Sequence, residues 1–210
     1  MEADTNNTLR GLGIDPEALL HRVGELEGRV ELGSADLAKA WYFSDANVFL
    51  QFEVFDQVDW PKETGHTAVV LVVPTAVLRA LDRYKSDREH RRRQMRARQV
   101  LPLFGKYALG VPPGAPAPIR SGVELLVRDR EPPIPGDFDP DDPDDRIVAD
   151  ALDFRWTRPG ANVLVLSGDY TVRLKARSRG LEQQAVPDHF ELEGNKPRRG
   201  GRGRSSGLNR

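Results

Sequence analysis

Three aspartates stand where a folded chain could gather carboxylates into one site. Asp45 and Asp169 each follow a short apolar run, and Asp145 precedes the apolar residues of a predicted helix. Carboxylates held about 4 Å apart repel one another by on the order of 4 kcal/mol per pair at an effective dielectric of about 20. A divalent cation removes that cost, and carboxylate and water ligands suit Mg²⁺ or Mn²⁺. Such an ion can polarise a phosphate and activate water, so the pattern predicts phosphodiester hydrolysis.

Each aspartate also has a purely structural interpretation. Asp45 and Asp145 could cap the helices that follow them, and Asp169 could be a turn residue. For any one of them alone the structural role is the commoner one, so the metal site is predicted from all three together. In the acidic stretch 137–145, Asp144 is the best placed to add a ligand, and most of the others are expected to form a solvated loop.

The elements that must position these residues are indicated by apolar runs. Residues 41–43, 69–73 and 162–166 show no polar alternation, which is typical of strands buried on both faces of a parallel sheet. Apolar residues at helical spacing predict helices over 75–84 and 146–156. Strands that alternate with helices predict an α/β fold, with a central parallel sheet in a three-layer α/β/α arrangement. The carboxyl ends of parallel strands share one edge, where ligands bind, so the aspartates should converge there.

The chain divides into a domain at residues 40–190 with an extension at each end. Residues 1–39 are predicted to be a helical extension that could pack on the domain or on a protein partner. Residues 191–210 have almost no apolar content, which predicts a disordered Arg/Gly-rich tail. Inside the domain, the Pro- and Gly-rich stretch 110–143 is expected to hold one strand pair or edge strand at 123–127. Three aromatic residues are predicted to belong to the core: Trp41, Tyr42 and Trp156.

Four blocks in this chain resemble those of the PIN-domain family, in order and spacing. They are residues 43–50, 73–85, 144–149 and 164–169, the last continued by 173–176 as in the PIN domains fused to PhoH-like ATPases. The resemblance implies a metal-dependent ribonuclease fold with acidic residues on one edge of a parallel sheet. By the matching positions, Asp45, Asp145 and Asp169 would hold Mg²⁺ or Mn²⁺ or position water. Asn47 and Ser167 would support them through hydrogen bonds.

The chain departs from this family pattern at two positions. Ala46 stands where the first block normally has Thr, and Ala80 stands where the second block normally has Glu. No acidic residue lies three or four positions from Ala80, where a helix could supply a substitute. The sequence therefore predicts a PIN-type endoribonuclease, with a catalytically weakened module that binds RNA or a protein partner as the alternative. A toxin of a toxin–antitoxin pair is a third interpretation, against which the chain length and the N-terminal helix argue.

Basic residues are concentrated in two segments. Residues 83–98 hold eight arginines and lysines against Asp87 and Glu89, and, if helical, would form a positive rod beside the site. Such charges bind phosphates without reading sequence, although a solvated helix face is the simpler alternative. The tail could hold single-stranded RNA through charge and guanidinium stacking, or act only as a solubilising segment. The predicted RNA-binding residues are Arg91, Arg92, Arg93, Arg198, Arg199, Arg202 and Arg204.

The composition of the 210-residue chain adds three constraints. It has no cysteine, which excludes disulfides and thiolate metal sites and favours a reducing cytoplasm. No apolar run approaches the roughly 20 residues that span a bilayer, so no membrane association is expected. The formal net charge is only −1, so the charge asymmetry is local rather than global. Homo-oligomerisation is left open.

Overall fold

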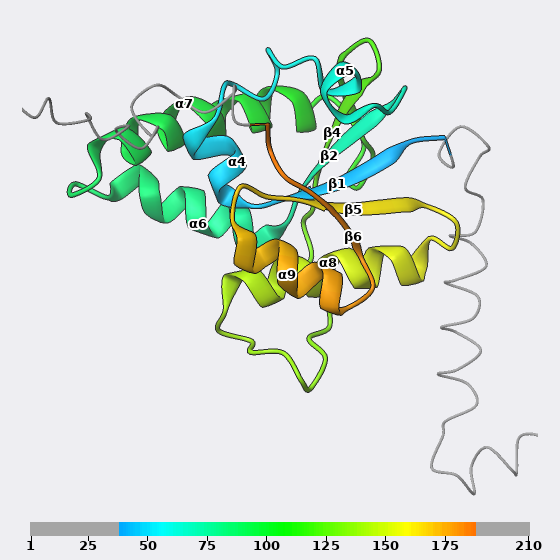
Figure 1. The fold of residues 1–210 in the computed structure, drawn as a ribbon. Helices are drawn as coiled ribbons and strands as arrows, with labels where there is room; N and C mark the ends of the chain where they lie inside the picture. Colours follow the sequence, from blue (N-terminus) through cyan, green and yellow to red (C-terminus); the bar gives the residue numbers. More distant parts are fainter. Residues whose placement is uncertain (1–37, 188–210) are drawn as a thin grey trace, which may run out of the picture.

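The computed structural model describes residues 38–187. The predicted N-terminal extension lies outside the described residues except for its last two positions, and the Arg/Gly-rich tail lies wholly outside them. Within 38–187 the chain forms an α/β domain whose sheet runs through the middle of the structure (Figure 1).

The sheet has six strands in the order β3-β4-β2-β1-β5-β6. The central strand β1 pairs in parallel with β2 on one side and β5 on the other. Only β3 runs antiparallel, as the edge partner of β4, which confirms the expected strand pair in the Pro- and Gly-rich stretch. The bounds are β1 Ala40–Ser44, β2 Val69–Val73, β3 Ala117–Arg120, β4 Val123–Val127, β5 Asn162–Leu166 and β6 Glu182–Gln184.

Helices cover both faces of this sheet, as the predicted fold class requires (Figure 1). Helices α8 and α9 lie together on one face, while α4 and α7 lie on the other, and α6 packs against both α7 and α8. The bounds are α4 Ala46–Gln51, α5 Trp60–Thr64, α6 Thr75–Ser86, α7 Arg91–Ala108, α8 Pro143–Thr157 and α9 Tyr170–Ser178.

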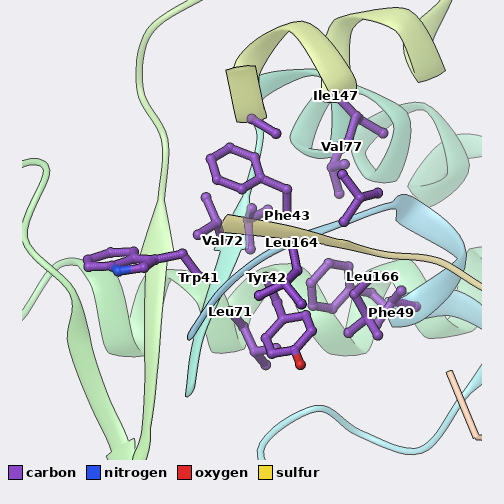
Figure 2. Packing of buried hydrophobic residues seen from close by; sticks show 14 of the residues in the cluster. Trp41, Tyr42, Phe43, Phe49, Leu71, Val72, Val77, Ile147, Leu164 and Leu166 are labelled. Carbon is purple, nitrogen blue, oxygen red and sulfur yellow. The ribbon is translucent and has the colours of Figure 1, made fainter. Parts of the chain in front are cut away.

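The core is built from the two faces of the central strands. Every residue of β1 is buried, because successive side chains point to opposite, equally covered faces. Phe43 lies on the face that also holds Val77 and Ile147, whereas Tyr42 and Phe49 lie on the other face (Figure 2). The side chains of β1 therefore pack into the core on both faces of the sheet. This packing fixes the end of β1, and with it the position of Asp45.

Two expectations for aromatic and basic residues need correction. Trp156 was expected in the core, but 80% of it is exposed. It follows the buried Phe154 by two positions on α8, about 200° around the helix, and so points to solvent. The Arg-rich segment is not one positive rod, because α6 ends at Ser86 and α7 begins only at Arg91. Between them, the Asp87 carboxylate accepts the backbone N–H groups of Glu89 and His90 and holds the chain in a turn.

Candidate metal site

Asp45 is the most deeply buried acidic residue at the carboxyl edge of the sheet. It follows β1 directly and caps α4, where its Oδ1 accepts the backbone N–H of Val48 at 2.9 Å. Its Oδ2 accepts a hydrogen bond from the Ser167 hydroxyl at the end of the neighbouring β5. Only 3% of Asp45 is exposed, and burial raises its pKa to about 6, although these hydrogen bonds oppose the shift. Burial disfavours the charged form of a carboxyl group, so a nearby cation stabilises the Asp45 carboxylate more than it would stabilise an exposed one.

Asp144 is the acidic residue that couples to Asp45. It lies in the first turn of α8, half-buried, and its negative charge contributes to raising the pKa of Asp45. The pKa of Asp144 is itself raised, first by burial and then by the charges of Asp142, Asp169 and Asp145, while Lys175 opposes these effects. At this edge of the sheet the charge of Asp144 therefore acts on Asp45, and the charge of Asp169 acts on Asp144.

Asp145 is held by a different set of partners. The Lys175 ammonium group on α9 lies 2.8 Å from its Oδ1, and the backbone N–H of Asp139 donates to its Oδ2 at 2.8 Å. Burial acts to raise the pKa of Asp145, but the hydrogen bonds from Lys175 and Asp139 outweigh it and lower the pKa. Lys175 also pairs with Asp142, which is the actual N-cap of α8. Asp145 is thus compensated by a cation of the protein itself, and its role as a metal ligand stays a prediction.

Asp169 and the two predicted supporting residues lie around Asp45. Asp169 is exposed and caps α9, where its Oδ1 accepts the backbone N–H of Thr171 at 2.7 Å. Ser167 is fully buried; it donates to Asp45 and accepts the backbone N–H of Asp169 at 2.9 Å, so it joins the two acidic residues. The Asn47 side chain instead accepts from Gln51 at 2.9 Å, while its backbone N–H bonds to Asp45.

The acidic groups at this edge can be tested for whether they suit a divalent cation. Among residues 38–187, no three His, Asp or Glu side chains stand in an arrangement that could hold a metal ion. The convergence of three carboxylates that we expected is therefore not formed in this arrangement. The carboxylates of Asp45 and Asp144, each with a raised pKa, are nevertheless hard oxygen donors of the kind that Mg²⁺ and Mn²⁺ prefer. By their chemistry, Asp45 and Asp144 would suit such an ion.

Ala80, which stands where the family pattern has Glu, lies on α6, the helix that follows the carboxyl end of β2. It is 8% exposed and lies on α6 one turn after Ala76 and one turn before Arg83. Ala76 and Arg83 both line a hollow between α6 and the start of α8, so the helical repeat places Ala80 on the same side. An alanine there adds no oxygen ligand to the site.

Of the predicted RNA-binding arginines, the structure describes only the three at the start of α7. Arg91 and Arg92 are exposed at the start of α7, and the Arg93 guanidinium lies 5.4 Å from the centre of the Tyr84 ring. The four arginines predicted in the tail lie outside the described residues. Arg96 has a structural role that the sequence did not reveal, since it donates to the backbone oxygens of Phe49 and Phe52 at the end of α4.

Three comparisons with known proteins were made, and the family comparison covers the residues of this site. The family model described as "PIN domain" matches residues 42–186, which include every described aspartate discussed above. No curated protein matches the chain. Among solved structures, a domain of a functionally unknown protein from Methanocaldococcus jannaschii is similar, with 13% identity and a TM-score of 0.41. The match covers 71% of this chain and 91% of that one.

Among the described residues, no helix is long and apolar enough to cross a membrane.

Proposed function

The chain belongs to the PIN domain family, whose members are generally metal-dependent nucleases, and from this we propose that it hydrolyses RNA phosphodiester bonds with Mg²⁺ or Mn²⁺. The observation that carries the proposal is the Asp45–Asp144 pair. Two elements that are distant in sequence bring these carboxylates to the carboxyl edge of a parallel sheet, where burial raises both pKa values and the charge of Asp144 adds to the shift of Asp45. Two such groups are costly to the fold unless a cation is bound, so they point to a function rather than to stability.

Each residue has a distinct part in the proposed mechanism. Asp45 is the fixed ligand, because Val48 and Ser167 hold both of its oxygens in place. Asp144 is the second ligand, and the exposed Asp169 is placed to accept a hydrogen bond from water or substrate at the rim. A divalent cation, when bound, supplies charge against the phosphate and increases the acidity of water. Lys175 keeps Asp145 and Asp142 neutralised beside them.

A catalytically weakened module that binds RNA or a protein partner is the second candidate function. Two observations favour it: position 80 carries no carboxylate, and Lys175 already neutralises Asp145 and Asp142. Both reduce the number of carboxylates left for metal ions. Such a module would bind RNA in the absence of Mg²⁺ and Mn²⁺ and would not cut it when either ion is added.

A nuclease assay on mixed single-stranded and structured RNA, with Mn²⁺ or Mg²⁺, tests the two candidates. Asp45→Asn should abolish cleavage. The adjacent pair Asp144→Asn and Asp145→Asn is the informative comparison, since each removes one charge from the same turn. We expect the Asp144 variant to lose far more activity than the Asp145 variant. Cleavage that survives Asp45→Asn, or that needs neither ion, would rule out the proposed site, and wild-type RNA binding without cleavage would establish the weakened module.

The remaining expectations stay predictions. These are a cytoplasmic location, RNA binding through the tail, a protein partner at the N-terminal extension and homo-oligomerisation.

A further inference from the structure

An open hollow of about 620 Å³ lies beside the acidic edge, between α6 and the start of α8. Three arginines line it: Arg79 and Arg83 from α6, and Arg146 from α8. Pro143 also lines it, and the two α8 residues bracket Asp144 in the chain. The hollow therefore adjoins the proposed metal site through the first turn of α8.

Two of these arginines are bridged by a single carboxylate. Arg79 lies 2.9 Å from Oε1 of Glu131, and Arg146 lies 3.2 Å from Oε2 of the same side chain. Glu131 belongs to the segment between β4 and α8, so it reaches two helices at once. More than half of the Arg79 side chain is exposed, and the other two side chains are partly exposed, so solvent and ligands can reach this bridge.

Arg79 and Arg146 are held so that both guanidinium groups contact one anionic group, which in this structure is the Glu131 carboxylate. A carboxylate that offers one oxygen to each of two guanidinium groups resembles a phosphodiester, whose two free oxygens can be shared in the same way. We propose that Arg79 and Arg146 form a clamp for one backbone phosphate of a single-stranded polynucleotide. Glu131 occupies the clamp in the free protein and gives it up when the strand binds.

Other charges in the hollow fit this role. Asp82 and Asp141 also line it, but Asp82 is paired with Lys85 at 2.6 Å, and the three lining arginines outnumber the two aspartates. Arg83 lines the hollow without belonging to the bridge. Glu131 thereby sets the affinity for polyanions, because a phosphate must displace it before it reaches both guanidinium groups.

The proposed clamp rests on the proposed nuclease function in one respect: that the bound polynucleotide continues from the clamp toward the metal site. Its test therefore uses binding alone, in EDTA, with a fluorescein-labelled oligouridylate and the oligodeoxythymidylate of the same length. Glu131→Gln keeps the size of the side chain and releases both arginines. Glu124→Gln on β4 is the matched control, because it makes the same change and the same gain in net charge. Glu124 forms its ion pair with Lys39 and does not line the hollow.

We expect Glu131→Gln to tighten binding of both oligonucleotides about fivefold at low salt, the effect of one partly exposed charge pair. The log–log salt slope should steepen by about 0.7, which corresponds to one more phosphate neutralised on a single strand. Adding Arg79→Met or Arg146→Met to Glu131→Gln should remove the gain. The clamp is refuted if Glu131→Gln and Glu124→Gln tighten binding equally, if the gain survives either arginine substitution, or if only one oligonucleotide shows it. Absence of cleavage with Mn²⁺ would instead count against the nuclease proposal and leave this result unaffected.

Discussion

Replacement of Asp45 by Asn should make the metal-free protein more stable at alkaline pH. The asparagine Oδ1 can still accept the backbone N–H of Val48, because Asn caps helices as well as Asp does. Its amide can donate to the Ser167 hydroxyl, which has lone pairs to receive it. The substitution therefore removes the buried charge while it keeps the local structure.

The size and pH dependence of this gain follow from the pKa of Asp45. Burial raises the pKa from 3.8 to about 6, so the folded state binds a proton that the unfolded state has lost between those two values. Stability is therefore full below the unfolded pKa and falls as pH rises through the folded pKa. A difference of about 2 units costs the wild type on the order of 3 kcal/mol at about pH 8. For a domain of about 150 residues this is a shift in Tm of about 6–12 °C.

Thermal and urea unfolding of both proteins at about pH 4.5 and pH 8, in EDTA and in Mg²⁺, would measure this gain. We expect the stability gain of Asp45→Asn in EDTA to be large at the higher pH and much smaller at about pH 4.5. Mg²⁺ should stabilise the wild type and leave the variant unchanged. Equal stability of the two proteins in EDTA at the higher pH would refute the reasoning, as would an equal response of both to Mg²⁺.

Asp150 provides the control for this experiment. Burial raises its pKa to about 6 as well, but its carboxylate is paired with Arg128 at 2.6 Å. Asp150→Asn removes a charge whose pKa is raised as far as that of Asp45, but it does so at the ion pair with Arg128, so this variant should respond to Mg²⁺ as the wild type does.

Three further predictions concern the same site and its surroundings. Ala80→Glu should tighten Mn²⁺ binding in calorimetry and increase any cleavage, since the residue lies on the side of α6 that faces the hollow; no change in either would place it outside the site. Lys175→Met should lower the Tm in EDTA and increase the stabilisation by Mg²⁺, because Asp142 and Asp145 lose their cation; an unchanged response to Mg²⁺ would contradict this. Alanines at positions 91–93, or deletion of residues 195–210, should weaken RNA binding and make the salt slope shallower by about 0.7 for each phosphate that the variant no longer neutralises. Unchanged anisotropy titrations across a salt series would show that these arginines are only solvated surface.

The amino-acid sequence alone predicted the central strands and the residues that follow their carboxyl ends. The runs 69–73 and 162–166 matched β2 and β5 to the residue, because unbroken β-branched and leucine runs are stable only between two covered faces. Asp45 could be assigned to the carboxyl edge of the sheet for the same reason, since it follows such a strand. The order of four short blocks was enough to indicate the family that covers residues 42–186.

The partners of these acidic residues depend on how the helices pack on the sheet, which the sequence pattern does not show. Asp144 and Asp145 are adjacent, so a helix separates their directions by about 100°, and only the packing of α8 on the sheet sets which one turns toward Asp45. Lys175 neutralises Asp145, and Glu131 links Arg79 to Arg146, across distances in sequence that no local pattern records. Trp156 likewise shared the apolar pattern of its helix but faces solvent. Sequence periodicity fixes which residues share a face, whereas the rotation of each helix about its axis is fixed by the side chains it buries.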